Sequence, residues 1–124
     1  MGKTNSLRKI IQTNISKITK CFCRVADKKE QYPYAVYDIE EIDLGDLYRD
    51  DWILVVDVWD KGTDTAAAED ISDQIEAVFN AVNMPGKDVL PTFYRMSRKP
   101  IDDEDKTIIH RQLKFQVQNY EIGG

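Results

Sequence analysis

The run WILVVDVWD, from Trp52 to Asp60, constrains the fold more than any other part of the chain. Its β-branched and aromatic residues favour a strand. Apolar side chains occupy both of its alternating faces except at Asp57. Such a strand suits the centre of a sheet, covered on both sides. The rest of the chain must therefore supply neighbouring strands and covering helices.

Two segments have the period of an amphipathic helix. The first runs from about Ser6 to Thr19, with Asn5 or Ser6 as its cap, and the second begins after a cap at Asp64 or Thr65. Their apolar stripes are Leu7, Ile10, Ile11, Ile15 and Ile18, and Ile71, Ile75, Val78, Phe79 and Val82. The second helix is expected to stop at Asn83, Pro85 and Gly86.

Four more segments are predicted to be strands: Cys21–Asp27, Pro33–Ile42, Thr92–Ile101 and Thr107–Glu121. Short connections favour one hairpin between the first two and another between the last two. The last strand alternates, with His110 on its wet face. We therefore expect a single α+β domain over 1–124. Its sheet is mostly antiparallel, with about five strands and two helices packed on one face, in the order α-β-β-β-α-β-β.

The overall composition is that of an ordinary globular domain, with 42% hydrophobic and 31% charged residues among 124. No apolar run approaches the roughly 20 residues of a membrane helix. The basic N-terminus lacks the continuous apolar stretch of a signal peptide. We expect a protein of the cytoplasm, or of an assembly built there, without membrane contact. A basic first helix lying on a membrane is the alternative.

Charge is divided unevenly along the chain. Residues 1–31 carry eight Lys or Arg against Asp27 and Glu30, a net +6, which leaves −11 for the remainder of a chain of net charge −5. A nucleic-acid-binding domain normally concentrates basic residues over one face. The acidic remainder would repel phosphates, so a role in gripping DNA is disfavoured.

Acidic residues gather in two places. The candidate interaction or channel-rim residues are Asp43, Asp46, Asp50 and Asp51 in the first place, and Asp102, Asp103, Glu104 and Asp105 in the second. One interpretation is a pair of loops kept soluble by charge. The other is a surface that must not adhere to a polyanion. The second run lacks the alternating ligand spacing of a calcium loop. The segment Asp43–Asp46 is predicted to be a turn.

No catalytic motif is present: the sequence has neither a glycine-rich phosphate loop nor G-x-S-x-G. A catalytic dyad of Cys21 or Cys23 with His110 has the required residue types, but nothing in their spacing supports it. These cysteines are expected to be free thiols, because a disulfide between positions i and i+2 is strained, and zinc needs more ligands. A nuclease built on Asp57 and Glu104 would need acids that converge on Mg²⁺. We expect no catalytic, metal or cofactor-binding residues.

The ordered set of segments resembles a known family. It comprises the N-terminal helix followed by YPYAVYDIEE, WILVVDVWDKG with its Val58-Trp59 pair, TAAAEDISDQIEAVF, FYRMSRKP and HRQLKFQVQ. In this order, over nearly the whole chain, it resembles the tail-completion proteins of long-tailed bacteriophages, the tail terminator or tail-to-head joining family. No single motif among these is specific.

The resemblance implies a non-enzymatic ring, commonly a hexamer, on the last ring of tail-tube protein. Such a ring stops tube growth and offers a docking surface to the head connector or neck protein. It would sit in the virion tail, or in a phage-tail-like particle, after assembly in the bacterial cytoplasm. DNA would pass through it without specific binding, past an acidic rim. The acids could instead face basic residues of a neighbouring ring. A head-completion or neck adaptor and a small cytoplasmic α+β binding module remain alternatives.

Overall fold

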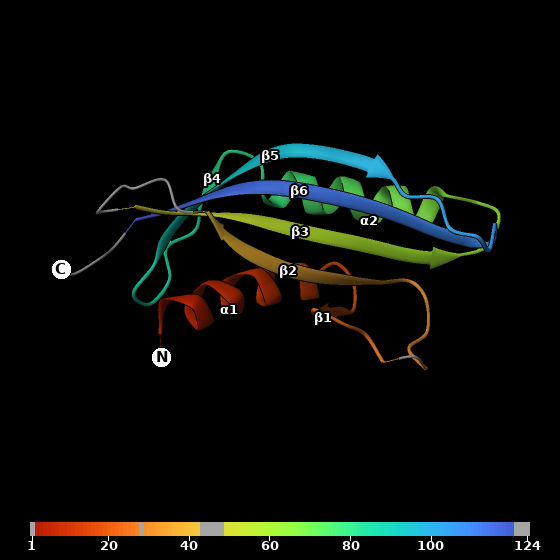
Figure 1. Ribbon diagram of the computed structural model, residues 1–124, viewed down its shortest axis with the longest axis horizontal. Helices are drawn as coiled ribbons and strands as arrows, with labels where there is room; N and C mark the ends of the chain where they lie inside the picture. The colour runs from red at the N-terminus through yellow and green to blue at the C-terminus, as the bar shows by residue number, and fades with distance from the viewer. Residues whose placement is uncertain (1, 28, 43–48, 121–124) are drawn as a thin grey trace.

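The structure is a computed structural model that describes residues 2–27, 29–42 and 49–120. In chain order, its elements are α1 (Lys3–Ser16), β1 (Cys21–Cys23), β2 (Tyr34–Ile42), β3 (Arg49–Lys61), α2 (Ala66–Val78), β4 (Val82–Asn83), β5 (Leu90–Pro100) and β6 (Ile108–Tyr120). The predicted α+β class is confirmed, with one more strand than expected (Figure 1). No helix of the described residues is long and apolar enough to cross a bilayer.

The six strands form one open sheet in the order β1-β2-β3-β6-β5-β4. The strand predicted to be central, β3, does lie at its centre. It pairs antiparallel with β6 along its whole length, from Arg49 opposite Tyr120 to Lys61 opposite Ile108. The predicted hairpin of β5 and β6 is also confirmed, with a bulge between Arg95 and Ser97. Only β1 departs from the antiparallel pattern.

The first predicted hairpin is wrong. The strand beginning at Cys21 ends at Cys23 and runs parallel to β2, from Cys21 opposite Ala35 to Cys23 opposite Tyr37. Arg24 explains the early end, since its φ of 71° places it in the left-handed region, where its N–H still bonds the Tyr37 carbonyl at 2.8 Å. The chain then leaves the sheet and returns to the start of β2, so the pair runs parallel.

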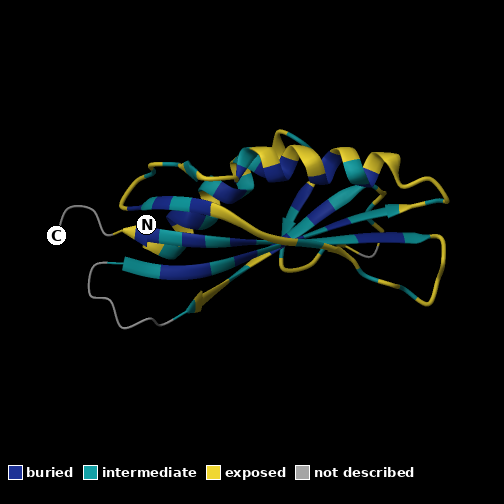
Figure 2. Cartoon of the chain, turned by 90° about the horizontal axis from the view of Figure 1, so that it is seen from above, coloured by how far each residue is buried: buried dark blue, intermediate teal, exposed yellow. Residues whose placement is uncertain are grey.

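Both helices pack on the same face of the sheet. Alternate residues of β3 on that face, Leu54, Val56 and Val58, are fully buried, whereas Val55 and Asp57 between them are only half-buried. Figure 2 shows this alternation as dark blue and teal bands along the strands. The expectation that β3 is covered on both sides is therefore wrong. The apolar stripes of α1 and α2 enter a single core, so no described element is left to cover the other, open face.

The helix ends differ from the predicted ones. Helix α1 already begins at Lys3, with Gly2 as its cap, so neither Asn5 nor Ser6 caps it. For α2 the cap is confirmed: Thr65 occupies the N-cap, and the Asp64 carboxylate accepts the Ala66 N–H at 2.9 Å. That helix ends at Val78 instead of continuing past position 82. The chain reverses at Ala81, where φ is 51°, and the two residues that follow form β4.

Candidate interaction surfaces

The acidic run at 102–105 forms the loop between β5 and β6. The Asp105 carboxylate accepts hydrogen bonds from the Thr107 hydroxyl at 2.6 Å and the Thr107 N–H at 2.9 Å, and Asp103 accepts the Asp105 N–H at 2.9 Å. These bonds from Thr107, with the attraction of Lys61, hold the pKa of Asp105 below its usual range. Two of the acids therefore shape the loop, while Asp102 and Glu104 lie exposed to solvent.

Asp50 and Asp51 of the other acidic set lie at the opposite end of the sheet, where β3 begins (Figure 1). Asp51 is only 2% exposed and forms an ion pair with Arg49, whose Nε lies 2.8 Å from Oδ1. A hydrogen bond with Tyr120 and the attraction of Asp51 raise the pKa of Arg49. Asp50 pairs with Lys3 at 2.6 Å. Both carboxylates are thus matched by cations of the same chain.

The remaining members of that set, Asp43 and Asp46, lie outside the described residues. The structure therefore does not bring the two predicted acidic sets together: Asp50 and Asp51 lie at one end of the long strands, and the loop at 102–105 lies at the other. If either set forms an interaction surface, it does so alone.

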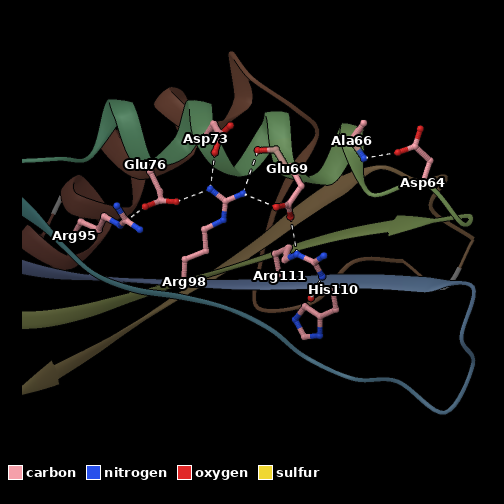
Figure 3. Close-up of polar contacts among 9 residues, drawn as sticks. All are labelled: Asp64, Ala66, Glu69, Asp73, Glu76, Arg95, Arg98, His110 and Arg111. Carbon is pink, nitrogen blue, oxygen red and sulfur yellow. Dashed lines mark hydrogen bonds and ion pairs between the residues drawn. The ribbon is translucent and has the colours of Figure 1, made fainter.

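The main ionic cluster joins α2 to the sheet, and the sequence analysis did not predict it. Arg98 of β5 points at the helix, where its Nη1 lies 2.6 Å from Asp73 and 2.7 Å from Glu76, and its Nη2 lies 3.2 Å from Glu69 (Figure 3). Burial opposes the charge of Arg98, but the hydrogen bonds to Asp73 and Glu76 outweigh it, so the pKa of Arg98 is raised.

Two further arginines complete this cluster. Arg111 of β6 places its Nε 2.6 Å from Glu69, and Arg95 of β5 contacts Glu76 (Figure 3). Three acids of the helix thus meet three arginines of the sheet, and the charges balance. The available signal was the spacing of Glu69, Asp73 and Glu76, which places them on one side of a helix. The cluster holds α2 on the sheet and presents no unmatched charge to a ligand.

His110 belongs to a polar group on the open face of β3 and β6. Its Nε2 lies 2.6 Å from Oδ1 of Asp57, which also accepts a bond from Gln112 at 3.2 Å. The imidazole stacks on Trp59, with ring centroids 3.7 Å apart and the planes inclined by 19°. The prediction of an exposed His110 is wrong, because Trp59 covers the ring and leaves the residue 9% exposed.

The structure does not bring together the residues of the two enzyme hypotheses, the Cys-His dyad and the nuclease. Cys21 and Cys23 are free thiols, as predicted, and they share the register of Ala35 and Tyr37 on the helix-covered face, away from His110. Burial raises the pKa of the Cys21 thiol to about 12. Glu104 is an exposed residue of the loop between β5 and β6, whereas Asp57 lies within β3. Within 2–27, 29–42 and 49–120, no three His, Cys, Asp or Glu residues are grouped so as to hold a metal ion.

An apolar groove lies between α1 and the segment after β4. Ile10, Met84 and Pro85 line it, Lys9 and Lys87 add two cations, and its volume is about 420 Å³. The segment approaches the helix closely at Gly86, since a Cβ there would lie 2.6 Å from Cδ1 of Ile10. No sequence motif marked this groove.

Comparison with known proteins identifies similar folds only among solved structures. No family model and no curated protein matches the sequence. A chain of the virion of a native gene transfer agent particle matches with a TM-score of 0.74 and 10% identity, covering 95% of this chain and 94% of that one. A second solved chain, whose description states no function, matches with a TM-score of 0.78 and 10% identity over 100% of both chains. At such identities these matches establish a shared fold.

Proposed function

We propose that this chain is a structural protein of a phage, a prophage or a phage-tail-like particle, and that it terminates the tail. It would form a ring, commonly of six copies, on the last ring of tail-tube protein, stop tube growth and present a surface to the head connector. In this role the chain is not an enzyme.

One observation carries the proposal: the fold matches a chain of a gene transfer agent virion over nearly the full length of both. The ordered segments that resemble tail-completion proteins point independently in the same direction, because they rest on sequence and not on coordinates. The polar groups described above also suit a scaffold. The charged groups of the ionic cluster between α2 and the sheet pair with one another inside the chain, and so do His110 and Asp57.

Within this proposal, the loop at 102–105 is the better candidate for a channel rim. Asp102 and Glu104 are exposed there, whereas Asp50 and Asp51 are already paired with Lys3 and Arg49. Unmatched carboxylates around a central channel would repel DNA and let it slide. The same loop could instead meet a basic surface of the neighbouring ring, where charge sets register and encounter rate.

Electron microscopy of particles from a host in which this gene is deleted tests the proposal. We expect tubes of excessive and variable length, with heads unattached. Tails of normal length lying beside full heads would assign the chain to head completion or the neck. Intact, infectious particles would contradict a structural role in the virion and would favour a small binding module of the cytoplasm.

A further inference from the structure

Each lateral edge of the sheet is only half covered. Strand β1 pairs with Ala35–Tyr37 and leaves Asp38–Ile42 of β2 without a partner on that side, among the described residues. Strand β4 pairs with Thr92–Phe93 and leaves Tyr94–Pro100 of β5 without an outer partner there. An unpaired edge presents a row of N–H and C=O groups to which another strand can add.

The directions of the two free stretches allow them to pair with each other between two copies. Strand β2 is antiparallel to β3, β3 to β6 and β6 to β5, so β2 and β5 run in opposite directions across the sheet. If a second copy is placed beside the first in the same orientation, its β2 would therefore lie antiparallel to β5. This continues the antiparallel alternation that already holds for five of the six strands, all but β1.

The covered halves also fit such a contact. If Asp38–Ile42 of one copy lay beside Tyr94–Pro100 of the next, β4 would continue the line of β2 past Ile42. In the same way, β1 would continue the line of β5 past Pro100. The two edges would then form a stepped joint, in which each short strand fills the space that the neighbouring copy leaves.

Charge favours joining unlike edges. The free stretch of β2 carries Asp38, Glu40 and Glu41, all exposed, and contains no basic residue. The free stretch of β5 carries no acid. Although Arg98 is committed to α2, Lys99 is exposed and the side chain of Arg95 remains 54% exposed. Pairing β2 with β2 would set acids against acids, and like charges opposite each other destabilise a sheet.

Apolar side chains accompany these charges. Tyr94 and Met96 of β5 are 39% and 53% exposed, and both lie on the free stretch. On β2, Ile39 and Ile42 are half-buried. A strand added at either edge would cover part of this apolar surface.

From these observations we infer that a second copy of this chain docks edge to edge, with Asp38–Ile42 of one copy pairing antiparallel with Tyr94–Pro100 of the next. Such a contact is heterologous, so repetition closes a ring or extends a filament. The inference rests on the proposed ring and specifies its subunit contact as a sheet that continues from copy to copy.

Disulfide trapping between two full-length variants tests this contact. Glu40→Cys and Ser97→Cys place one thiol on each free stretch, on the open face of the sheet. The background is Cys21→Ala/Cys23→Ser, checked for cooperative unfolding. The two proteins are mixed at high concentration under mild oxidation, and heterodimer is measured by non-reducing electrophoresis and mass spectrometry. We expect it to form at least about ten-fold faster than with Gln74→Cys, an exposed control on α2, in place of Ser97→Cys.

Equal rates for the test and control pairs would overturn the inference, and would indicate that the bulge at Met96 and the proline at position 100 keep this edge unpaired. Faster formation of Glu40→Cys or Ser97→Cys homodimers would overturn it in favour of a two-fold contact. Failure of the proposed function is distinguishable, because it appears as normal tails in the gene deletion. If the disulfide forms but tails are normal in the gene deletion, the contact between copies stands and the tail role is wrong. If tails are overlong but no disulfide forms, the tail role stands and the proposed contact is wrong.

Discussion

Arg98 is the residue whose loss should most disturb the attachment of α2. Its side chain is 18% exposed and neutralises Glu76, whose side chain is 10% exposed. We expect Arg98→Ala to lower the free energy of unfolding by about 2–3 kcal/mol, because it leaves a nearly buried carboxylate with one cation fewer. Chemical denaturation of the purified protein measures this loss.

Arg95→Ala is the matched control, because Arg95 contacts the same glutamate from a side chain that is 54% exposed. Exposed ion pairs contribute about 0–1 kcal/mol, so the loss should be clearly smaller. Equal losses for the two variants would mean that burial does not decide the strength of this cluster.

Cys21 should make stability depend on pH in the alkaline range. Burial, aided by the neighbouring Cys23, raises the pKa of its thiol from 9.0 to about 12. The folded chain therefore keeps a proton that the unfolded chain releases. The contribution of this protonated thiol to the free energy of unfolding is fully present below pH 9 and is lost as the pH rises toward 12. Between pH 8 and pH 10.5 we expect wild type to lose about 2 kcal/mol more than Cys21→Ala.

Denaturation curves of both proteins at the two pH values give this difference directly. Cys23→Ala serves as the control because it retains the buried Cys21 thiol. Since burial is the larger cause of the raised pKa, this variant should lose nearly as much stability as wild type. If Cys21→Ala lost as much stability as wild type, the alkaline sensitivity would have to come from other groups, such as the tyrosines.

At the scale of elements, β3 allows a direct test of the one-sided core. Leu54 is fully buried under the helices, whereas its neighbour Ile53 lies half-buried on the open face. We expect Leu54→Ala to cost about 2–5 kcal/mol and Ile53→Ala about 1 kcal/mol, measured by denaturation at concentrations that keep the chain monomeric. Similar costs would show that something covers the second face as well.

Sequence patterns located the long elements. Of the two short strands, they predicted the start of β1 at Cys21 but not its end, and they missed β4. The central strand, both helices and the last hairpin were predictable because apolar periodicity over nine or more residues is a strong signal. The same pattern misled at β3, since Val55 and Trp59 suggested a second covering layer that no described element supplies. Strand β4 has two residues and β1 three. The end of β1 and the position of β4 depend on positive φ angles at Arg24 and Ala81, which neither residue type predicts.

At the scale of the whole molecule, the loop at 102–105 contains acids whose substitution should affect function without affecting stability. Asp102 and Glu104 are exposed, whereas Asp103 and Asp105 bond the loop backbone. We expect Asp102→Asn/Glu104→Gln to change the free energy of unfolding by less than about 0.5 kcal/mol. In particles, a channel rim predicts tails of normal length and attachment with impaired passage of DNA, scored by electron microscopy and infectivity. Loss of attachment with normal ring formation would point to a contact between rings.

The candidate site was less predictable than the fold. Clusters of acids are visible in a sequence, but their partners are not: Lys3 and Asp50 are 47 positions apart, and Glu69 and Arg111 are 42 apart. Pairing across such distances depends on strand order, which local patterns do not encode. The stepped edges of the sheet likewise emerge only when the lengths of β1 and β4 are known.

The long pairing of β3 with β6 has a consequence for how the chain acquires its structure. Its partners are separated by 47 positions at Lys61–Ile108 and by 71 at Arg49–Tyr120. During synthesis, β3 must therefore wait, without its principal neighbour, until nearly all of the chain has left the ribosome. Contacts this distant in sequence slow folding, and an exposed apolar strand invites association in the meantime. A nascent chain that stops before Ile108 should consequently remain unfolded and dependent on chaperones.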